Sequence, residues 1–286
     1  MESFETYRPY LFAIAYRMLG SAMDAEDMVQ ETYLRSQDTK PETIHSLKAY
    51  LSTILIRLCM DQLHLARRKR EQYVGPWLPE PILTEETEDP ANPEKRAEMQ
   101  ESIELAFLVL LEQLQPFERA VFLLSEVFEY TFAEIATMLG KSEVACRSSF
   151  SRAKKHLVGQ RPRFKPAPDQ HRQLLTSFLA AVQSGEMTPL TNLLSEKVVL
   201  WTDAGGKTRT AALRPIHGRE AVARMSLGTK RFWPENARFE LREVNGQAAL
   251  IGRVDGRVWI VLALDVEQGQ IQAIRIIGNP DKLTRV

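Results

Sequence analysis

The chain has 286 residues, more than the roughly 100 to 200 of a typical domain, so we expect two or three domains. Apolar residues make up 44% of the chain and charged residues 26%, which excludes fibrous and wholly disordered proteins. The N-terminus lacks a signal-peptide pattern, and no stretch is apolar over the roughly 18 residues of a membrane span, so we expect a cytoplasmic protein with no membrane partner.

The net charge of zero hides an uneven distribution of charge along the chain. Residues 1–72 hold 10 basic and 10 acidic side chains, whereas residues 73–140 hold 3 basic and 14 acidic ones. The balance then reverses, with 8 basic and 1 acidic side chains in residues 141–168, and 16 and 12 in residues 169–286. We therefore expect separate acidic and basic surfaces, and a basic surface suits nucleic acid.

Three helices are expected in the first part of the chain, from apolar residues that recur every three or four positions. The first helix ends at Gly20, and the second has Asp24 as its N-cap. The third begins near Leu47, turns its apolar side chains through Leu65 inward, and ends in a run of basic residues. We expect these helices to form one all-α domain over residues 1–72.

A linker is expected over residues 73–100, because prolines stand among acidic residues there and prevent a helix from continuing. It contains the run Trp-Leu-Pro-Glu-Pro at positions 77–81. A tryptophan between prolines in such a stretch should bury its ring against another part of the protein.

A helix-turn-helix is expected within a second all-α domain, over residues 101–160. A short helix from Thr131 to Leu139 is followed by Gly140, and Ser142 caps the next helix. That helix buries one apolar stripe, and its opposite face is rich in donors suited to phosphates and base edges. The donors are Arg147, Ser148, Ser151, Arg152, Lys154 and Lys155. The alternative is an ordinary helical hairpin with a solvated basic face.

The last part of the chain, residues 169–286, changes from helical to strand-like patterns. One amphipathic helix comes first, and the last four strand-like runs are separated by Asn245-Gly246, Asp255-Gly256 and Gln268-Gly269. Each pair tolerates positive φ and so suits a tight hairpin turn. We therefore expect an α+β domain with a helix and a curved antiparallel sheet.

Cys59 and Cys146 each lie within an apolar helical pattern and have no His or Cys at metal-ligand spacing. We expect both to be buried thiols, and we expect no disulfide, metal site or cofactor. The sequence also holds no recognisable catalytic motif, so we expect that the protein is not an enzyme.

The second predicted helix carries a polar face, on which Asp27, Gln30 and Glu31 lie opposite the apolar stripe. Alone, such a face is usually just solvated. Followed in order by a helix with a basic end and by a helix-turn-helix, it resembles the sigma-70 family of RNA polymerase subunits, and within it the short extracytoplasmic-function (ECF) sigma factors. The resemblance implies that the chain binds the RNA polymerase core through its β′ and β subunits and directs transcription initiation at promoter DNA.

The resemblance also implies roles for three sets of residues. The core-docking set is Asp24, Glu26, Asp27, Gln30 and Glu31. The minus-ten set, which would melt and capture the promoter, is Arg57, Asp61, Arg67, Arg68, Lys69 and Arg70. The minus-thirty-five set comprises the six donors of the helix-turn-helix. An ion pair with Arg57 at i, i+4 spacing is an equally good interpretation of Asp61.

Three short motifs narrow the resemblance to the ECF subgroup that bears a C-terminal SnoaL-like (NTF2-like) domain. The linker motif is Trp77, Leu78, Pro79, Glu80 and Pro81; the glycine motif is Asp203, Gly205, Gly206 and Lys207; the terminal motif is Asn279, Pro280, Asp281, Lys282 and Leu283. Ala204 stands where the subgroup usually has glycine, which puts the local turn in question. The resemblance implies a cone-shaped α+β domain over residues 169–286, whose two motifs contact the linker motif and regulate the sigma factor in cis.

Other functions stay open on the sequence alone. SnoaL-like folds also serve as cyclases and isomerases, with Asp203, His217 and Asp265 as acid–base candidates here, although His217 suits a structural role at a helix start. A helix-turn-helix regulator fused to such an enzyme or to a small-molecule-binding domain is the main alternative, and a dimeric repressor that ignores polymerase is a third. An unknown small ligand of the C-terminal domain is also left open.

Overall fold

The computed structural model describes residues 3–37, 44, 46–84, 103–157, 167–208 and 211–286, apart from the side chains of residues 67–69. The chain forms two compact units. The first comprises Met1–Glu71, Glu94–Ile103 and Phe107–Arg161, and the second comprises Gln72–Pro93, Glu104–Ala106 and Pro162–Val286, each as far as its residues are described. Most of the predicted linker, residues 85–100, lies outside the described residues.

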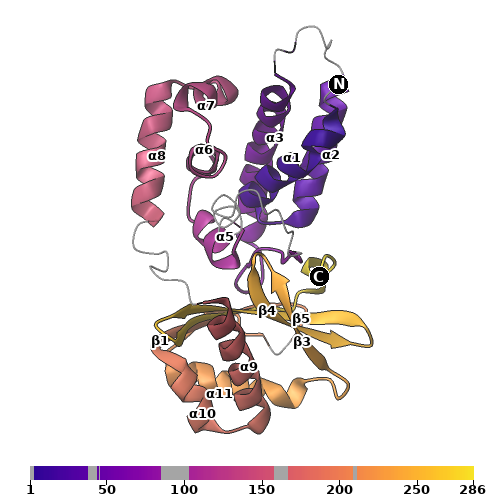
Figure 1. The fold of residues 1–286 in the computed structure, drawn as a ribbon, viewed down its shortest axis with the longest axis vertical. Coiled ribbons are helices and arrows are strands. Elements are labelled where there is room, and N and C mark those ends of the chain that lie inside the picture. Colours follow the sequence, from indigo (N-terminus) through magenta and orange to yellow (C-terminus); the bar gives the residue numbers. More distant parts are fainter. Residues whose placement is uncertain (1–2, 38–43, 45, 85–102, 158–166, 209–210) are drawn as a thin grey trace. The chain divides into compact units, whose positions relative to one another are not determined.

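The first unit begins with α1 (Phe4–Leu19), α2 (Ala22–Gln37) and α3 (Leu47–Arg70), which pack against one another (Figure 1). Gly20 ends α1 in the left-handed conformation at φ 68°, as predicted. The predicted N-cap Asp24 is wrong, because α2 starts earlier and Ser21 Oγ accepts from the Asp24 amide at 3.1 Å. Leu65 was also predicted wrongly, because it is 55% exposed: the buried stripe of α3 passes through Leu63, and Leu65 points elsewhere two residues later.

The first unit continues, from Phe107 onward, with α5 (Leu105–Leu111), α6 (Pro116–Glu126), α7 (Phe132–Leu139) and α8 (Glu143–Leu157). Thr131 and Ser142 cap α7 and α8 with their hydroxyl groups, and Gly140 ends α7 in the left-handed conformation. Helix α8 packs against both α6 and α7, with Cys146 fully buried. The predicted helix-turn-helix is therefore confirmed as α7 and α8, and Cys146 and Cys59 are buried thiols, as predicted.

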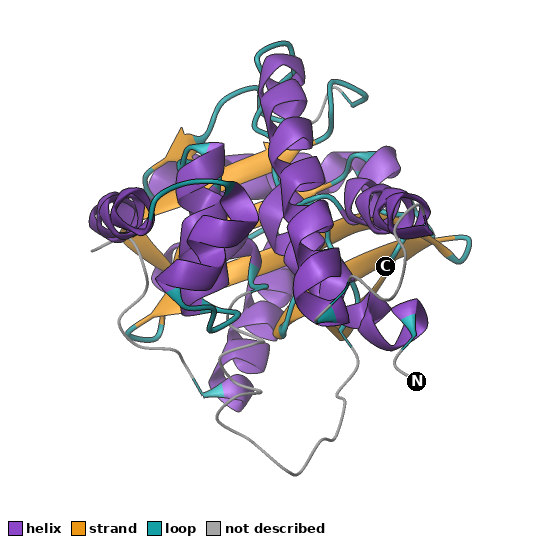
Figure 2. Cartoon of the chain, turned by 90° about the horizontal axis from the view of Figure 1, so that it is seen from above, coloured by secondary structure: helices purple, strands orange, loops and turns teal. Residues whose placement is uncertain are grey.

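The second unit combines helices with a single sheet (Figures 1 and 2). Its helices are α9 (Pro168–Ser184), α10 (Met187–Leu193) and α11 (Arg219–Thr229), with short 3₁₀ turns at η2 (Lys230–Phe232) and η3 (Pro280–Lys282). Its strands are β1 (Leu194–Asp203), β2 (Ile216–His217), β3 (Arg238–Val244), β4 (Gln247–Val254), β5 (Arg257–Glu267) and β6 (Gln270–Ile277), in the order β2-β1-β6-β5-β4-β3. The three α-helices lie on one face of the sheet, and Phe178, Val222 and Ile274 are among the buried side chains between them. This is the predicted α+β architecture of helices and a sheet.

The sheet is mixed rather than antiparallel throughout, because β1 pairs with β6 in parallel. The hairpins that join β3 to β6 are as predicted: Asn245-Gly246, Asp255-Gly256 and Gln268-Gly269 all have positive φ. A tight turn forces an antiparallel pairing only on the strands that it joins. Since β2, α11 and three more strands separate β1 from β6 in the chain, no turn sets their relative direction, and the prediction was wrong there.

Candidate functional site

The carboxylate of Asp203, the last residue of β1, is fully buried and joins the three sequence motifs. Its Oδ2 accepts hydrogen bonds from the Leu78 amide at 2.7 Å and from Lys282 Nζ at 2.6 Å. Its Oδ1 accepts from the hydroxyl of Tyr73. A buried carboxylate is tolerated only where donors and an opposite charge compensate for lost hydration, and these three donors supply both. We call Tyr73, Leu78, Asp203, Asn279 and Lys282 the Asp203 cluster.

The ammonium group of Lys282 is the cationic centre of the Asp203 cluster. Besides its ion pair with Asp203, Nζ donates to the Leu78 carbonyl at 2.5 Å. It also lies 4.2 Å from the ring centre of Trp77 and 5.1 Å from that of Tyr73, within the range of cation–π attraction. One buried lysine thus contacts the glycine motif and the linker motif at the same time.

Tyr73 completes the cluster as a neutral donor. Its hydroxyl donates to Asp203 and accepts a hydrogen bond of 2.9 Å from Asn279 Nδ2. Burial, and then the neighbouring Asp203 carboxylate, raise the pKa of Tyr73 well above its ordinary value, so the phenol keeps its proton at neutral pH. The sequence interpretation missed Tyr73, which stands four residues before the linker motif and carries no signal of its own.

The glycine motif needs glycines because neighbouring side chains lie close to their Cα atoms. A Cβ on Gly205 would lie 2.6 Å from Asn279 Nδ2, and Gly205 and Gly206 both have positive φ. Ala204, the departure from the usual motif, does not have positive φ, so its methyl group is accommodated. Beyond this turn Lys207 forms an ion pair of 2.6 Å with Asp281, a second link between the glycine and terminal motifs.

A second set of contacts holds the residues that follow the linker motif. Ile82 and Asn245 are joined by two hydrogen bonds, from the Ile82 amide to Asn245 Oδ1 at 3.1 Å and from the Asn245 amide to the Ile82 carbonyl at 3.0 Å. The Thr84 amide donates to the Glu243 carbonyl at 3.1 Å, and the Leu83 amide to the Arg285 carbonyl at 3.4 Å. Residues 73–84 are therefore attached to the second unit at two places, the Asp203 cluster and the β3–β4 turn.

The linker motif itself is largely buried by these contacts. Leu78, Pro79, Glu80 and Pro81 are buried, and Trp77 is half-buried under Lys282. In the terminal motif Asn279, Lys282 and Leu283 are buried, whereas Pro280 and Asp281 are exposed. The structure thus brings together the members of all three motifs that the sequence singled out.

The core-docking set lies along α2. Asp27 and Gln30 are exposed, and the other three are half-buried. Glu26 forms an ion pair of 3.2 Å with Arg8, and Glu31 one of 2.7 Å with Arg35. Asp24 accepts from Gln62 Nε2 at 3.3 Å. Asp27 and Gln30 are consequently the members of this set that present the most open surface.

The minus-ten set lies along α3, where the structure describes Arg57, Asp61 and Arg70, and the side chains of residues 67–69 lie outside the described residues. Arg57 Nε donates to the Met138 carbonyl of α7 at 3.0 Å. Arg70 donates to the Leu19 carbonyl at 3.0 Å and forms an ion pair with Glu112, the residue that follows α5. No ion pair joins Arg57 to Asp61 among the described side chains, so the alternative interpretation of Asp61 finds no support.

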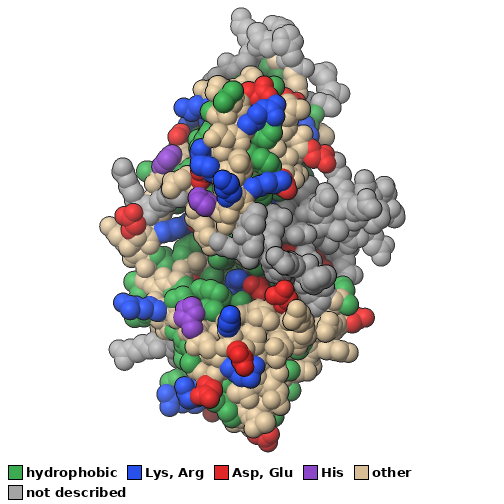
Figure 3. All heavy atoms as spheres, turned by 90° about the vertical axis from the view of Figure 1, so that its left-hand side faces the viewer, with side chains coloured by type: hydrophobic (Ala, Val, Ile, Leu, Met, Phe, Trp, Pro, Cys, Tyr) green, Lys and Arg blue, Asp and Glu red, His purple; other side chains and the backbone are tan. Residues whose placement is uncertain are grey.

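The minus-thirty-five set lies on the outward face of α8, and all six members are exposed. Figure 3 shows Lys and Arg side chains, with acidic ones between them, on the face of the first unit that carries this helix. Three of the set are in ion pairs: Arg147 with Glu143, Arg152 with Glu118 at 2.9 Å, and Lys154 with Glu126 at 3.2 Å. Because Glu118 is buried, Arg152 also has a structural role in holding α8 to α6.

Inside the first unit, α1 and α3 contact α6 and α7 through buried polar groups. Arg119 of α6 is fully buried, and its Nη1 donates to the Met18 carbonyl at 2.7 Å and to Glu112 Oε1 at 2.8 Å. Burial lowers the pKa of Arg119 to about 9. Tyr10 donates to the hydroxyl of Tyr130 at 2.9 Å. Arg119 is the one basic residue between positions 106 and 140, a sequence signal whose meaning we missed.

The acid–base candidates of the second unit do not form a catalytic group. Asp265 is paired with Arg275, His217 is exposed on β2, and Asp203 belongs to the cluster described above. The described residues contain no group of three His, Cys, Asp or Glu side chains placed to hold a metal ion. None of the described helices combines the length and the apolar character that crossing a bilayer requires.

Comparisons with known proteins show which family the chain is similar to. Residues 3–71 match the family model Sigma-70 region 2, and residues 104–157 match Sigma-70, region 4. The chain is similar to the ECF RNA polymerase sigma factor SigJ of Mycobacterium tuberculosis, with 36% identity over 295 residues, covering 99% of this chain and 93% of that protein. It is also similar to the probable ECF RNA polymerase sigma factor SigI of that species, with 31% identity over 284 residues, covering 98% and 93%. The crystal structure of the M. tuberculosis extracytoplasmic function sigma factor SigJ gives a TM-score of 0.77 at 34% identity, covering 99% of this chain and 97% of that chain.

We predict that Lys282→Met releases the linker motif from the second unit. The substitution leaves the buried Asp203 carboxylate without its cation, a change that costs about 3–5 kcal/mol unless water reaches the carboxylate. Water can reach it if residues 73–84 detach, so amide hydrogen exchange in peptides covering these residues should become faster. Lys197→Met, which removes an exposed lysine from the same strand as Asp203, is the control and should leave the exchange unchanged. Equal exchange in both variants would contradict the role given to the ion pair.

Proposed function

The chain belongs to the ECF sigma factors of the sigma-70 family, and we propose how its parts contribute to promoter recognition and control. The protein is an initiation factor and not an enzyme, because the chemistry of RNA synthesis belongs to the polymerase. We propose that it acts in the cytoplasm, bound to the polymerase core and to promoter DNA. The observation that carries the proposal for control is the buried Asp203 carboxylate, which joins the linker motif to the C-terminal unit.

Helix α2 is the proposed docking surface for the polymerase core, on its β′ subunit. Asp27 and Gln30 are exposed there and lie one turn apart on the same face. Glu26 and Glu31, whose carboxylates are paired with Arg8 and Arg35 on the surface, would exchange those arginines for groups of the polymerase. Surface pairs of this kind are worth little, so they present a low barrier to that exchange.

The basic end of α3 and the outward face of α8 are the proposed contacts with the minus-ten and minus-thirty-five elements. On α8, Arg147 lies near the N-terminal end, where a recognition helix meets base edges, and Lys155 lies near the C-terminal end, where phosphate contacts are expected. Ser148 and Ser151 offer further donors between them. Arg152 forms an ion pair with Glu118. If DNA binding breaks this pair, the free energy of the pair is lost.

The first unit has the features of a closed form that must open to bind a promoter. The two promoter elements lie roughly 25 base pairs apart, which at about 3.4 Å each is about 85 Å. Helix α3, at 24 residues, is only about 36 Å long, and Arg57 on this helix donates directly to α7 of the helix-turn-helix. Helices in direct contact cannot reach both elements, so α1–α3 and α6–α8 would separate, breaking the bonds of Arg57, Arg119 and Tyr10.

The C-terminal unit is proposed to control that opening through the chain connection between α3 and α5. Residues 72–84 belong to the second unit although helices of the first unit precede and follow them in the chain. Separation of α1–α3 from α6–α8 would draw on this connection, and the Asp203 cluster and the β3–β4 turn restrain it. These contacts shift the equilibrium between the closed and open forms only if they are more stable in one form than in the other.

We predict that Asp27→Ala weakens binding of the chain to the polymerase core without changing its choice of promoter. Loss of one well-placed interface residue is worth about 1 kcal/mol or more, which corresponds to roughly a fivefold lower affinity. Fluorescence anisotropy of the labelled chain titrated with core enzyme measures it, with Asp169→Ala, an exposed acid at the start of α9, as the control. A changed base preference at unchanged core affinity would overturn the assignment of α2.

We also predict that removing the terminal motif alters transcription. A chain ending at Gly278 lacks Asn279 and Lys282, so the Asp203 carboxylate loses its cation, the Leu78 carbonyl loses the hydrogen bond from Lys282, and Tyr73 loses the one from Asn279. In transcription with purified core enzyme at a target promoter, the output should change by about fivefold or more, the range of a coupling free energy of about 1 kcal/mol. A second truncation after residue 168 removes the whole domain as a companion variant. Unchanged output from both truncated chains would reject control by this domain.

A further inference from the structure

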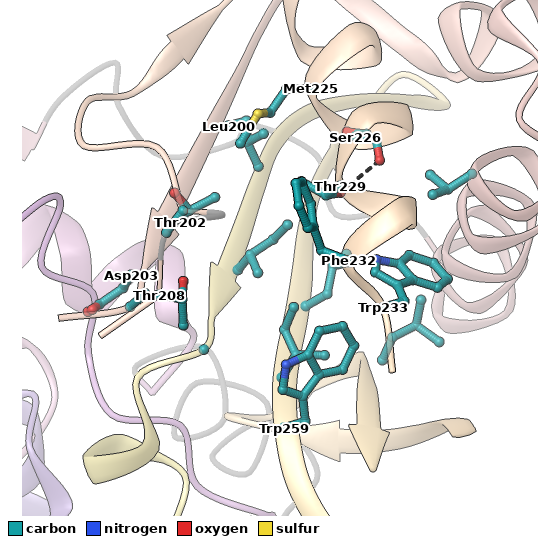
Figure 4. Close-up of a pocket in the computed structure, with 18 of the residues that line it drawn as sticks. Leu200, Thr202, Asp203, Thr208, Met225, Ser226, Thr229, Phe232, Trp233 and Trp259 are labelled. Atoms are coloured by element: carbon teal, nitrogen blue, oxygen red, sulfur yellow. Dashed lines mark hydrogen bonds between the residues drawn. The ribbon is translucent and has the colours of Figure 1, made fainter. Parts of the chain in front are cut away.

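The second unit contains an apolar pocket between the sheet and helices α9 and α11. Its empty volume, including the mouth that opens to solvent, is about 970 Å³. Five aromatic residues line it together with aliphatic side chains: Phe178, Phe232, Trp233, Phe239 and Trp259. Figure 4 shows Trp233, Trp259 and Phe232 facing the same space as Leu200 and Met225. Phe232 is 53% exposed, and the Arg231 guanidinium lies 4.7 Å from its ring centre.

Three hydroxyl groups that line this pocket are already bonded within the protein. Thr202 Oγ1 accepts from the Ala212 amide at 2.8 Å and donates to its carbonyl at 3.1 Å. The hydroxyls of Ser226 and Thr229 donate to carbonyls of their own helix at 2.9 and 2.8 Å. The described lining holds no Lys, Arg or His, and its acid, Asp203, turns its carboxylate away from the rings (Figure 4). A charged guest would therefore lose its hydration without gaining an opposite charge from these residues.

We propose that this pocket binds an uncharged, largely apolar ring compound, and that its occupancy is coupled to the Asp203 cluster. Flat rings suit the aromatic wall, because offset and edge-to-face contacts add to the free energy of burying apolar surface. Binding of the compound is independent of the proposed function. Coupling to the Asp203 cluster rests on the proposed function, since it would let a small molecule act on the C-terminal control unit.

The coupling follows from a stretch of backbone that the pocket and the cluster share. Thr202, Asp203 and Ala204 at the end of β1 line the pocket, as does Gly278 just after β6. The Gly278 amide donates to the Asp203 carbonyl at 2.8 Å, and the next residue, Asn279, bonds Tyr73 in the cluster. A guest that moves this wall by a fraction of an ångström also moves the Asp203 carboxylate relative to Leu78, whose amide it accepts at 2.7 Å.

Binding is tested on the full chain with N-phenyl-1-naphthylamine, a neutral fluorophore, and with 8-anilinonaphthalene-1-sulfonate, which carries the same rings and a negative charge. We expect saturable binding of the neutral compound, and affinity for the sulfonate lower by about tenfold or more. Met225→Trp, which fills the pocket from α11, should abolish binding of the neutral compound. Arg224→Trp, the preceding and exposed residue on the same helix, is the matched control and should leave binding unchanged.

Absence of saturable binding to the unaltered chain, or stronger binding of the sulfonate, would overturn the proposed ligand class. These measurements on the unaltered chain decide the matter even if Met225→Trp fails to fold. They need no polymerase, so they succeed or fail independently of the proposed function.

Coupling is tested from the side of the cluster. If a compound in the pocket changes the stability of the Asp203 cluster, then a change in the cluster must alter the affinity of the pocket for the compound by the same free energy. The affinity for N-phenyl-1-naphthylamine should change by about threefold or more in Lys282→Met, and should stay unchanged in Lys197→Met. Equal affinity in both variants would overturn the coupling. If affinity changes in Lys282→Met while transcription does not respond to the truncations above, the pocket and cluster are coupled but the proposed control of initiation fails.

Discussion

A buried carboxylate that must be compensated organises the C-terminal half of this protein. Asp203 lies at the end of β1 with its side chain fully out of solvent, so its charge needs nearby donors and a cation. Lys282 comes from the C-terminal turn, and Tyr73 and the Leu78 amide come from the segment after α3. Segments far apart in the sequence are thereby drawn to one point, and the linker motif becomes part of the second unit.

Because of this constraint, the chain that follows α3 belongs to the second unit, although it connects helices of the first unit. The chain ends α3 in the first unit, residues 72–84 belong to the second unit, and the chain is again in the first unit from Phe107 of α5. We propose that α1–α3 and α6–α8 separate to reach the two promoter elements. The chain between them is held by the Asp203 cluster, so the stability of this cluster would affect the separation. The ion pair, the cation–π contacts and the neighbouring pocket wall are each a place where a signal could change that stability.

Local patterns predicted local structure well, and contacts between distant segments poorly. The hairpin pairs, Gly140, Ser142 and the buried stripe of α8 follow from periodicity and turn chemistry alone. The parallel partner of β1, the role of Tyr73 and the pairing of Arg152 with Glu118 depend on residues brought together only by folding. The three motifs were singled out by family resemblance. How they are held together, by Lys282 and the Leu78 amide on the buried Asp203 carboxylate, could be seen only in the structure. The functions assigned to the docking and DNA-binding sets stay predictions.

The central claim is that the Asp203 charge links the C-terminal unit to promoter initiation by this sigma factor. It is tested most directly by transcription with purified polymerase core and either the unaltered chain or Asp203→Asn, which keeps the shape of the side chain but removes its charge. The account predicts that the unaltered chain supports initiation at a cognate promoter, and that Asp203→Asn, with its fold verified by tryptophan fluorescence, gives a clearly different output. Identical output from the two chains, or no initiation with the unaltered chain at any promoter, would contradict it.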